Sequence, residues 1–263
     1  MLDRSDLTRV GAEYGAAGQQ VRRDHLISHV LRALASLDLP VVFFGGTALA
    51  RTHLTTAESG GRLSEDIDLF TDDRPAVAAA LDSAIPRMLR REFPRSRWEP
   101  ALTGVRGVDP AQLVTDDGLR LRVQLLAMNT GHSDWKRWPT ERREVELRYR
   151  DVRGPAVLTV PTLSAFVAMK VSAYGDRHAP RDLFDLWALA RSGSIGADAA
   201  ELMRAATGTA PAPHMFASLP DMEWEAQLAH QTGNLPSPEE CLDAVRTAFA
   251  KALAWPEPYD PFA

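Results

Sequence analysis

The sequence of 263 residues contains a single cysteine, Cys241, so no intrachain disulfide can form. Chains without disulfides are typical of a reducing compartment, and we expect a cytoplasmic protein. No stretch reaches the roughly 18 consecutive apolar residues of a membrane-spanning helix. The N-terminal sequence MLDRSDLTRV carries acids where a signal peptide has an apolar region. We therefore expect no membrane partner.

A strong excess of basic residues is also absent. The formal net charge is -5, and 45% of the residues are hydrophobic. The mildly acidic balance argues against strong non-specific binding to nucleic acid, although a local basic patch remains compatible with it. The hydrophobic content is sufficient for one large domain or two modest ones.

The hydrophobic pattern predicts an α/β (α+β) N-terminal part and a mainly helical C-terminal part. Apolar residues at helical spacing indicate a helix over 19–37, and a short buried strand follows at 41–44. The segments DIDLFT and LRLRVQLLAM are typical of strands, and a helix is expected over 75–93. We predict a domain with a small mixed sheet over residues 1–154 and a helical domain over 155–263.

Two aspartates stand one residue apart in the segment DIDLFT. Alternate residues of a strand point to the same side, so Asp66 and Asp68 project together. Two ionised carboxylates so close repel each other unless a cation lies between them. Mg²⁺ prefers oxygen ligands and often takes one or two carboxylates with substrate phosphates. The alternative is a solvated strand end with two surface acids.

A Gly-Gly-Thr turn, Gly45 to Thr47, follows the strand at 41–44. Glycines permit a positive φ and a close approach of the backbone to a ligand. A helix that starts after such a turn offers free N–H groups and a positive dipole end to phosphate. About 20 residues separate the turn from Asp66, which allows the two strands to lie side by side. The alternative is an ordinary strand-to-helix turn.

Together these blocks resemble a known family of enzymes. The sequence FFGGTALARTHL followed by RLSEDIDLF resembles the AbiEii-type nucleotidyltransferase toxins, including the MenT toxins, of the DNA polymerase β-type superfamily. The same family combines a helical lysine with a downstream Arg-Asp-x-x-Asp-Leu block. Here Lys170 is followed by RDLFDLWAL, which begins at Arg181. The N-terminal domain is then expected to be the nucleotidyltransferase domain.

The resemblance implies a set of site residues and a reaction. The implied catalytic residues are Asp66, Asp68, Lys170 and Asp185, with Asp66 and Asp68 as the metal ligands. The implied nucleotide-binding residues are Gly45, Gly46, Thr47, Arg51, Arg62, Ser64 and Asp182. Mg²⁺, or Mn²⁺ in its place, would assist transfer of NMP from an NTP to an RNA, such as a tRNA 3′ end. Pyrophosphate would leave, translation would be blocked, and a separately encoded antitoxin would act as partner.

Two positions depart from the family pattern. Phe44 stands where the family often has a lysine, and Arg51 on the following helix is the candidate replacement cation. Gln124 stands on the strand where the superfamily usually has a third carboxylate. Because glutamine is a poor general base, no base is assigned.

The second block also has a purely structural interpretation. Lysine on an apolar helix usually extends its ammonium group to solvent, so Lys170 need not face a ligand. Asp182 and Asp185 lie on one side of a helix, and their pattern also fits a capped, salt-bridged helix start.

Arginines gather in the sequence PRMLRREFPRSRW and suggest an RNA-binding surface. The expected RNA contacts are Arg87, Arg90, Arg91, Arg95 and Arg97, of which the first three would share a helix face. Arginine suits phosphate, and Trp98 would stack on a base. The sequence WKRW at 135–138 is a similar, weaker signal. The alternative is a solvated helix face.

His25 and His29 have the spacing of a metal-binding pair on a helix. No third ligand stands near them in the sequence, so we expect surface histidines. For the whole protein, two rival functions remain open. One is a small-molecule, aminoglycoside-like nucleotidyltransferase, and the other is a non-catalytic nucleotide- or RNA-binding module.

Overall fold

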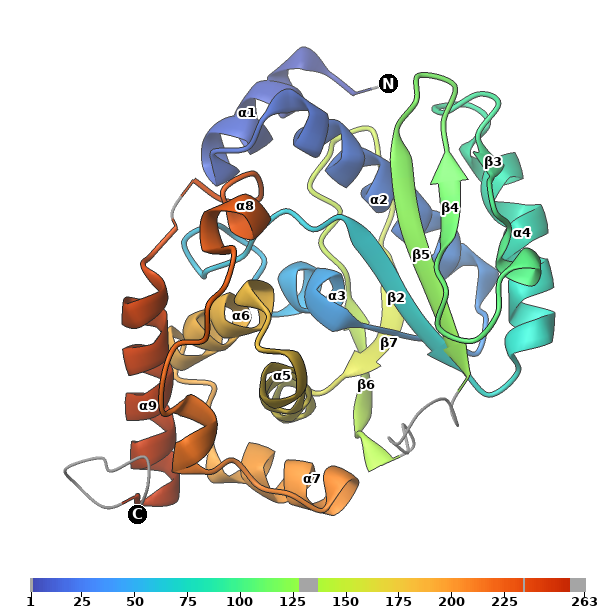
Figure 1. The fold of residues 1–263 in the computed structure, drawn as a ribbon. Helices are drawn as coiled ribbons and strands as arrows, with labels where there is room; N and C mark the ends of the chain where they lie inside the picture. Colours follow the sequence, from blue (N-terminus) through green and yellow to red (C-terminus); the bar gives the residue numbers. More distant parts are fainter. Residues whose placement is uncertain (1, 128–136, 234, 256–263) are drawn as a thin grey trace.

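The computed structural model describes residues 2–127, 137–233 and 235–255. In these ranges a seven-stranded mixed sheet is covered by helices, which confirms the predicted fold class (Figure 1). The strands are β1 (Val42–Phe44), β2 (Asp66–Thr71), β3 (Arg97–Trp98), β4 (Ala111–Val114), β5 (Arg120–Ala127), β6 (Thr140–Glu144) and β7 (Val157–Pro161).

The order of the strands brings the two N-terminal motifs together. The sheet runs β3-β4-β5-β2-β1-β7-β6. β1 pairs antiparallel with β2, and Phe44 lies opposite Asp68. β2 pairs in parallel with β5, and Asp68 lies opposite Gln124. The turn after β1 therefore starts beside the carboxylates of β2, as the spacing of the motifs predicts.

Helices account for most of the remaining described chain. They are α1 (Arg4–Tyr14), α2 (Gly18–Leu37), α3 (Gly45–Thr52), α4 (Arg74–Leu89), α5 (Leu163–Arg177), α6 (Pro180–Arg191), α7 (Ala197–Thr207), α8 (Trp224–Leu228) and α9 (Pro238–Leu253), with short 3₁₀ helices η1 (Leu102–Gly104) and η3 (Pro213–Phe216). Asp73, Thr162 and Ser237 cap α4, α5 and α9 by accepting backbone N–H bonds. Such caps satisfy donors that a helix start leaves unpaired. None of the helices described is long and apolar enough to cross a membrane.

β5 shows how the sheet separates its core face from its polar face. Leu121, Val123 and Leu125 are buried in the core, where α2 and α4 pack against this strand. The alternate residues Arg122 and Gln124 line a cavity on the other face. This alternation follows from the two-residue period of a strand.

The sheet and the C-terminal helices share one hydrophobic core. A continuous cluster of buried apolar residues extends from Val10 in α1 to Phe249 in α9. α6 packs against α9, α5 and α8, and α5 reaches the sheet through β7. Residue 154, the predicted boundary, precedes β7, so the sheet extends into the range expected to be helical.

Candidate active site

A cavity of about 550 Å³ opens over the polar ends of β1, β2 and β5. Asp66 and Asp68 both line it, as expected for alternate residues of one strand. Most residues predicted to bind the nucleotide also line it, namely Gly45, Gly46, Thr47, Arg62, Ser64 and Asp182, and so does Lys170, which was predicted to be catalytic. The fold thus brings together motifs that lie more than a hundred residues apart in the chain.

The turn between β1 and α3 approaches Asp68 so closely that only glycine fits. Gly45 has a φ of 79°. A Cβ atom at this position would lie 2.3 Å from Oδ2 of Asp68. At Gly46, a Cβ atom would lie 2.6 Å from Nη2 of Arg62. Gly45 is therefore required by a close approach as well as by backbone conformation, and Gly46 by a close approach alone.

We expect Gly45→Ala to reduce nucleotidyl transfer about 100-fold. The added methyl group must displace the Asp68 carboxylate, and a misplacement of about 1 Å at a reacting centre costs roughly this factor. Steady-state transfer rates measure the effect. Gly104→Ala is the matched control, because a Cβ atom there meets nothing within 4 Å. An active Gly45→Ala protein would show that the close contact is dispensable.

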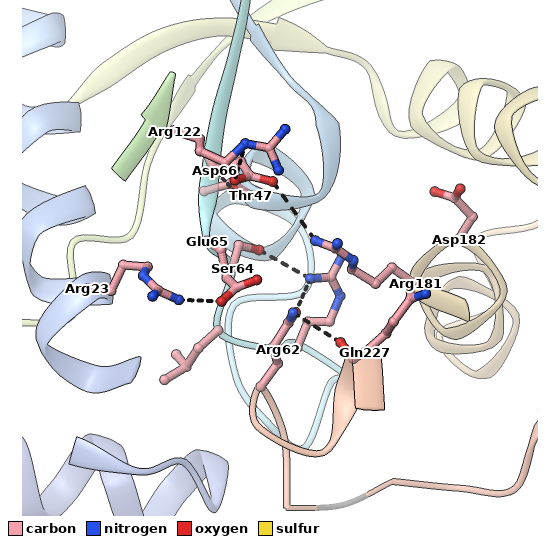
Figure 2. A network of polar contacts seen from close by, with 12 residues as sticks. Arg23, Thr47, Arg62, Ser64, Glu65, Asp66, Arg122, Arg181, Asp182 and Gln227 are labelled. Atoms are coloured by element: carbon pink, nitrogen blue, oxygen red, sulfur yellow. Dashed lines mark hydrogen bonds and ion pairs between the residues drawn. The ribbon is translucent and has the colours of Figure 1, made fainter. Parts of the chain in front are cut away.

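The two aspartates have different electrostatic surroundings. Burial and the neighbouring Asp66 raise the pKa of Asp68 to about 6, against an opposing effect of Lys170. Asp66 lies between two guanidinium groups (Figure 2). Nε of Arg122 is 3.8 Å from one of its carboxylate oxygens, and Nη1 of Arg181 is 3.9 Å from the other. Asp68 therefore carries the less compensated charge of the pair.

The hydroxyl groups of Thr47 and Ser64 form hydrogen bonds at the base of the cavity. Thr47 donates a hydrogen bond to the backbone carbonyl of Asp66, which joins α3 to β2. Ser64 accepts a hydrogen bond from Nη1 of Arg62 at 3.5 Å. Both side chains are buried. The Thr47 bond fixes the spacing between the glycines and the aspartate strand, and the Ser64 bond orders the loop that leads into that strand.

The two sequence blocks meet in a network of buried ion pairs. Nζ of Lys170 lies 2.6 Å from Asp185 and 3.0 Å from Asp182. Nε and Nη2 of Arg62 donate hydrogen bonds to the two carboxylate oxygens of Asp185, at 3.0 and 3.1 Å. Nε and Nη2 of Arg177 donate hydrogen bonds to the two carboxylate oxygens of Asp182, at 2.7 and 3.0 Å. The loop before β2 is thereby tied to α5 and α6.

This network determines what its members can do. Burial alone would lower the pKa of Lys170, but Asp185 and Asp182 reverse the shift and raise it. Burial alone would raise the pKa of Asp182, but Lys170 and Arg177 bring it to about 2. Lys170 is therefore a fixed cation in the cavity wall. Asp185, which was predicted to be catalytic, is not among the described residues that line the cavity, and its carboxylate pairs with Arg62 and Lys170.

Comparison with known proteins identifies the family. Residues 29–254 match the family model described as the nucleotidyl transferase AbiEii toxin of type IV toxin–antitoxin systems. The chain belongs to the AbiEii family. The resemblance seen in the sequence is thus confirmed, and membership supports a nucleotidyltransferase enzyme of a toxin–antitoxin system. A search of curated proteins finds no match.

Solved structures with this fold include two named relatives. MenT4, the nucleotidyltransferase toxin Rv2826c from Mycobacterium tuberculosis H37Rv, matches with a TM-score of 0.68 at 17% identity, over 98% of this chain and 91% of that one. JHP933 from Helicobacter pylori matches with a TM-score of 0.53 at 17% identity, over 89% of this chain and 91% of that one. At these identities the likeness concerns the fold.

The position of the superfamily's third acid holds an amide in this AbiEii protein. Gln124 lies opposite Asp68 in the parallel pairing of β5 with β2. Its Nε2 donates a hydrogen bond to the carbonyl of Val108. An amide cannot accept a proton as a carboxylate does, so the structure assigns no general base at this position.

Sequence reasoning missed two of the cations that surround the aspartates. Arg122 could have been found from the alternation of β5, because it shares a face with Gln124. Arg181 stands four residues before Asp185 on α6, a spacing that would allow the two to pair, but its guanidinium lies near Asp66 instead. The contact between Arg181 and Asp66 joins two separate elements, α6 and β2, so no pattern in the local sequence predicts it.

Arg51 was predicted to bind the nucleotide, but it is not among the described residues that line the cavity. It is 1% exposed, and its Nη2 lies 2.7 Å from Oδ1 of Asp24. Its Nη1 donates to the carbonyl of Glu146 at 2.7 Å. A buried guanidinium needs such partners, and they hold Arg51 away from the cavity. It therefore does not replace the cation that the family often has before the glycines.

The predicted arginine cluster does not reach the cavity. α4 ends at Leu89, so Arg90 and Arg91 follow the helix and the expected shared helix face with Arg87 does not form. All five arginines are exposed, and three pair with neighbouring acids, in Arg91–Glu92, Arg95–Asp116 and Arg97–Glu99. Trp98 is partly buried against the core. The surface is thus less positive than its arginines alone suggest.

Part of the WKRW sequence, residues 135 and 136, lies outside the described residues. Of the remainder, Arg137 is exposed, and its Nη1 donates to the carbonyl of Ala205 at 3.1 Å. Trp138 is buried and lines the cavity over β2.

The expectation of two surface histidines without a third ligand is wrong. His25 is 3% exposed, and the side chain of His29 is 13% exposed. Both contact the carboxylate of Asp151, which comes from the segment between β6 and β7. Burial lowers the pKa of both imidazoles, although Asp151 acts in the opposite direction. Sequence reasoning missed Asp151 because it lies 126 residues from His25.

Proposed function

We propose that this chain transfers NMP from an NTP to an RNA acceptor, the 3′ end of a tRNA, and releases pyrophosphate. The observation that carries the proposal is the position of Asp66 and Asp68 against the Gly45–Gly46 turn in a cavity with cationic walls. Phosphoryl transfer depends mainly on positioning and charge neutralisation, which this arrangement favours. A blocked tRNA 3′ end would stop aminoacylation and hence translation.

The donor atoms at the aspartate pair fit Mg²⁺. Two carboxylates project from one face of β2, and the amide of Gln124 lies beside Asp68. Hard cations take oxygen ligands of this kind together with phosphates and water. The raised pKa of Asp68 also supports a cation here, since a cation would relieve the same repulsion. When bound, Mg²⁺ or Mn²⁺ supplies charge neutralisation at the phosphates.

In this proposal, different residues of the cavity wall bind the phosphates and stabilise the leaving group. The guanidinium groups of Arg122 and Arg181 bind phosphate oxygens of the NTP, since arginine matches phosphate geometry. Gly45 and Gly46 let the backbone at the start of α3 approach the same phosphates. Lys170, fixed by its two carboxylates, stabilises the negative charge that grows on the leaving pyrophosphate.

We place the RNA acceptor at the open rim of this cavity, where Arg122 is 57% exposed and Arg177 is 63% exposed. The arginine cluster around Arg90 serves in this proposal as a second contact for the RNA backbone. A separately encoded antitoxin is the expected protein partner of a family member. The cationic rim disfavours the rival small-molecule function, because a cationic drug would need an acidic pocket.

The decisive experiment supplies purified protein with Mg²⁺, total tRNA and each α-³²P-labelled NTP in turn. We expect label to enter tRNA, with one NTP preferred. Asp68→Ala is the inactive control, and tRNA with a periodate-oxidised 3′ end tests the acceptor hydroxyl. Transfer to oxidised tRNA would contradict a 3′ acceptor. Label that enters no RNA would contradict the proposal and favour the small-molecule enzyme or the binding module.

We expect Arg181→Ala to raise the KM for NTP about tenfold, with a smaller effect on kcat. Removing a charge-assisted hydrogen bond to phosphate costs on the order of 1.5 kcal/mol, which corresponds to this factor. Initial rates over a range of NTP concentrations measure the split. Arg191→Ala is the matched control on the same helix, since Arg191 stacks on Trp187 away from the cavity. An unchanged KM in Arg181→Ala would remove Arg181 from the phosphate site.

A further inference from the structure

His25, His29 and Asp151 form a compact cluster outside the cavity over β2. The two histidines lie one turn apart on α2, so their side chains share a helix face. Asp151 reaches them from the segment between β6 and β7. None of the three is among the described residues that line the cavity over β2. The cluster is therefore separate from the proposed nucleotidyltransferase site.

The donor atoms of the cluster converge on one point. Nε2 of His25 lies 3.1 Å from Nε2 of His29 and 3.0 Å from Oδ2 of Asp151. Nε2 of His29 lies 3.4 Å from the same carboxylate oxygen. Zinc bonds of about 2.0–2.1 Å in a tetrahedral site imply separations of roughly 3.3–3.4 Å between ligand atoms. The observed separations match these to within a few tenths of an ångström.

Nε2 of His25 has more close polar neighbours than one proton can serve. The single Nε2 of His25 faces two carboxylate oxygens and a second imidazole nitrogen. One N–H proton cannot point at three acceptors with good geometry. A divalent cation between the three side chains would instead use a lone pair from each. Two imidazoles and a carboxylate are a ligand set that suits zinc and its first-row neighbours.

The cluster has aromatic side chains on one side and is partly exposed to solvent on another. The rings of Phe93 and Tyr149 pack against His25, with centroids 5.5 and 4.9 Å away. On the open side, His25 lines a cavity of about 590 Å³. The Asp151 side chain is 22% exposed. The exposed part of Asp151 gives a metal access from solvent, and zinc with three protein ligands takes a water molecule as its fourth ligand.

We propose that His25, His29 and Asp151 bind one zinc ion, which fastens the 148–151 segment to α2. The same segment supplies Arg148 and Tyr149, which hold the buried carboxylate of Asp24 at 3.1 and 2.9 Å. Asp24 in turn holds Arg51 of α3, the helix that begins at the glycine turn. The ion thus stabilises the layer that supports the cavity and takes no part in the transfer itself.

The test titrates metal-free protein with ZnCl₂ against a chromophoric chelator in Mg²⁺-free buffer, and records CoCl₂ spectra of the same samples. We expect one tight site per chain in the wild type, with the strong visible bands of a four-coordinate Co²⁺ site. His29→Gln and Asp151→Asn should each weaken zinc binding by at least about 100-fold, since even the loss of an outer partner costs roughly 10–100-fold and these residues are direct ligands. They should also lose the zinc-induced rise in Tm.

Two controls make the result specific. Asp68→Asn should keep the site, because the aspartate pair is elsewhere, and His214→Gln should keep it, because His214 is outside the cluster. Circular dichroism in chelator checks that each variant is folded, and Asp151→Asn carries the test if His29→Gln is not. Absence of stoichiometric zinc in the wild type would overturn the proposal, as would equal zinc affinity in Asp151→Asn.

Discussion

Asp68→Asn should abolish nucleotidyl transfer and yet make the metal-free protein more stable. Asp68 is held beside Asp66 in a buried position that raises its pKa to about 6. Ionising it in the folded state at neutral pH therefore costs free energy, on the order of 3 kcal/mol for a shift of this size. Asparagine removes that cost. We expect Tm in EDTA at pH 8 to rise by roughly 5 °C.

The pH dependence gives this prediction a second, independent check. A carboxyl group whose pKa is raised on folding destabilises the protein above the folded pKa, and the cost disappears as pH falls toward the unfolded value. The advantage of Asp68→Asn should thus be full above pH 6 and vanish near pH 4, the unfolded pKa being 3.8. Saturating Mg²⁺ should stabilise the wild type and leave Asp68→Asn unaffected.

Asp66→Asn is the matched control for this prediction. Asp66→Asn relieves the repulsion with Asp68 but also removes the pairing with Arg122 and Arg181, so it should stabilise less than Asp68→Asn, although transfer should also be lost. Equal Tm values for Asp68→Asn and the wild type in EDTA at pH 8 would contradict the electrostatic argument. Retained transfer in Asp68→Asn would contradict the assignment of the metal ligands.

Asp185→Ala should be the most destabilising single change near the cavity. It leaves the buried cations Lys170 and Arg62 without the carboxylate that they share. Breaking one partner out of a buried ion pair costs about 3–5 kcal/mol. Chemical denaturation should show this loss, with a fall in Tm of roughly 10 °C. Transfer should fall as well, because Arg62 and Lys170 both line the cavity.

The control for Asp185→Ala is the removal of a carboxylate from an ion pair that is more exposed to solvent. Glu65 pairs with Arg23, and their side chains are 27% and 22% exposed. Glu65→Ala should therefore cost less than about 1 kcal/mol. A double-mutant cycle of Lys170→Met with Asp185→Asn should give a coupling of at least about 1 kcal/mol, since the residues are in contact. Additive effects would show that the network does not act as a unit.

The sequence by itself was enough for the local geometry of the site. The two-residue period of a strand places Asp66 and Asp68 on one face, and the glycine turn must follow a strand that ends beside them. The sequence also singles out Gln124 as the candidate position of a third acid, and the pairing of β2 with β5 then places it opposite Asp68. The blocks around these residues also identify the family, which the family match confirms. Such features depend on spacing along the chain, which a sequence displays directly.

Only the tertiary structure decided which charged groups meet. It directs Arg51 to Asp24 and Arg181 to Asp66, and it encloses Lys170 between two carboxylates. It also brings Asp151 to the histidines of α2. A charged side chain that is removed from water must take whatever opposite charge the packing places beside it. Because packing joins separate elements, and in the case of Asp151 and His25 residues 126 positions apart, these choices leave no pattern in the sequence.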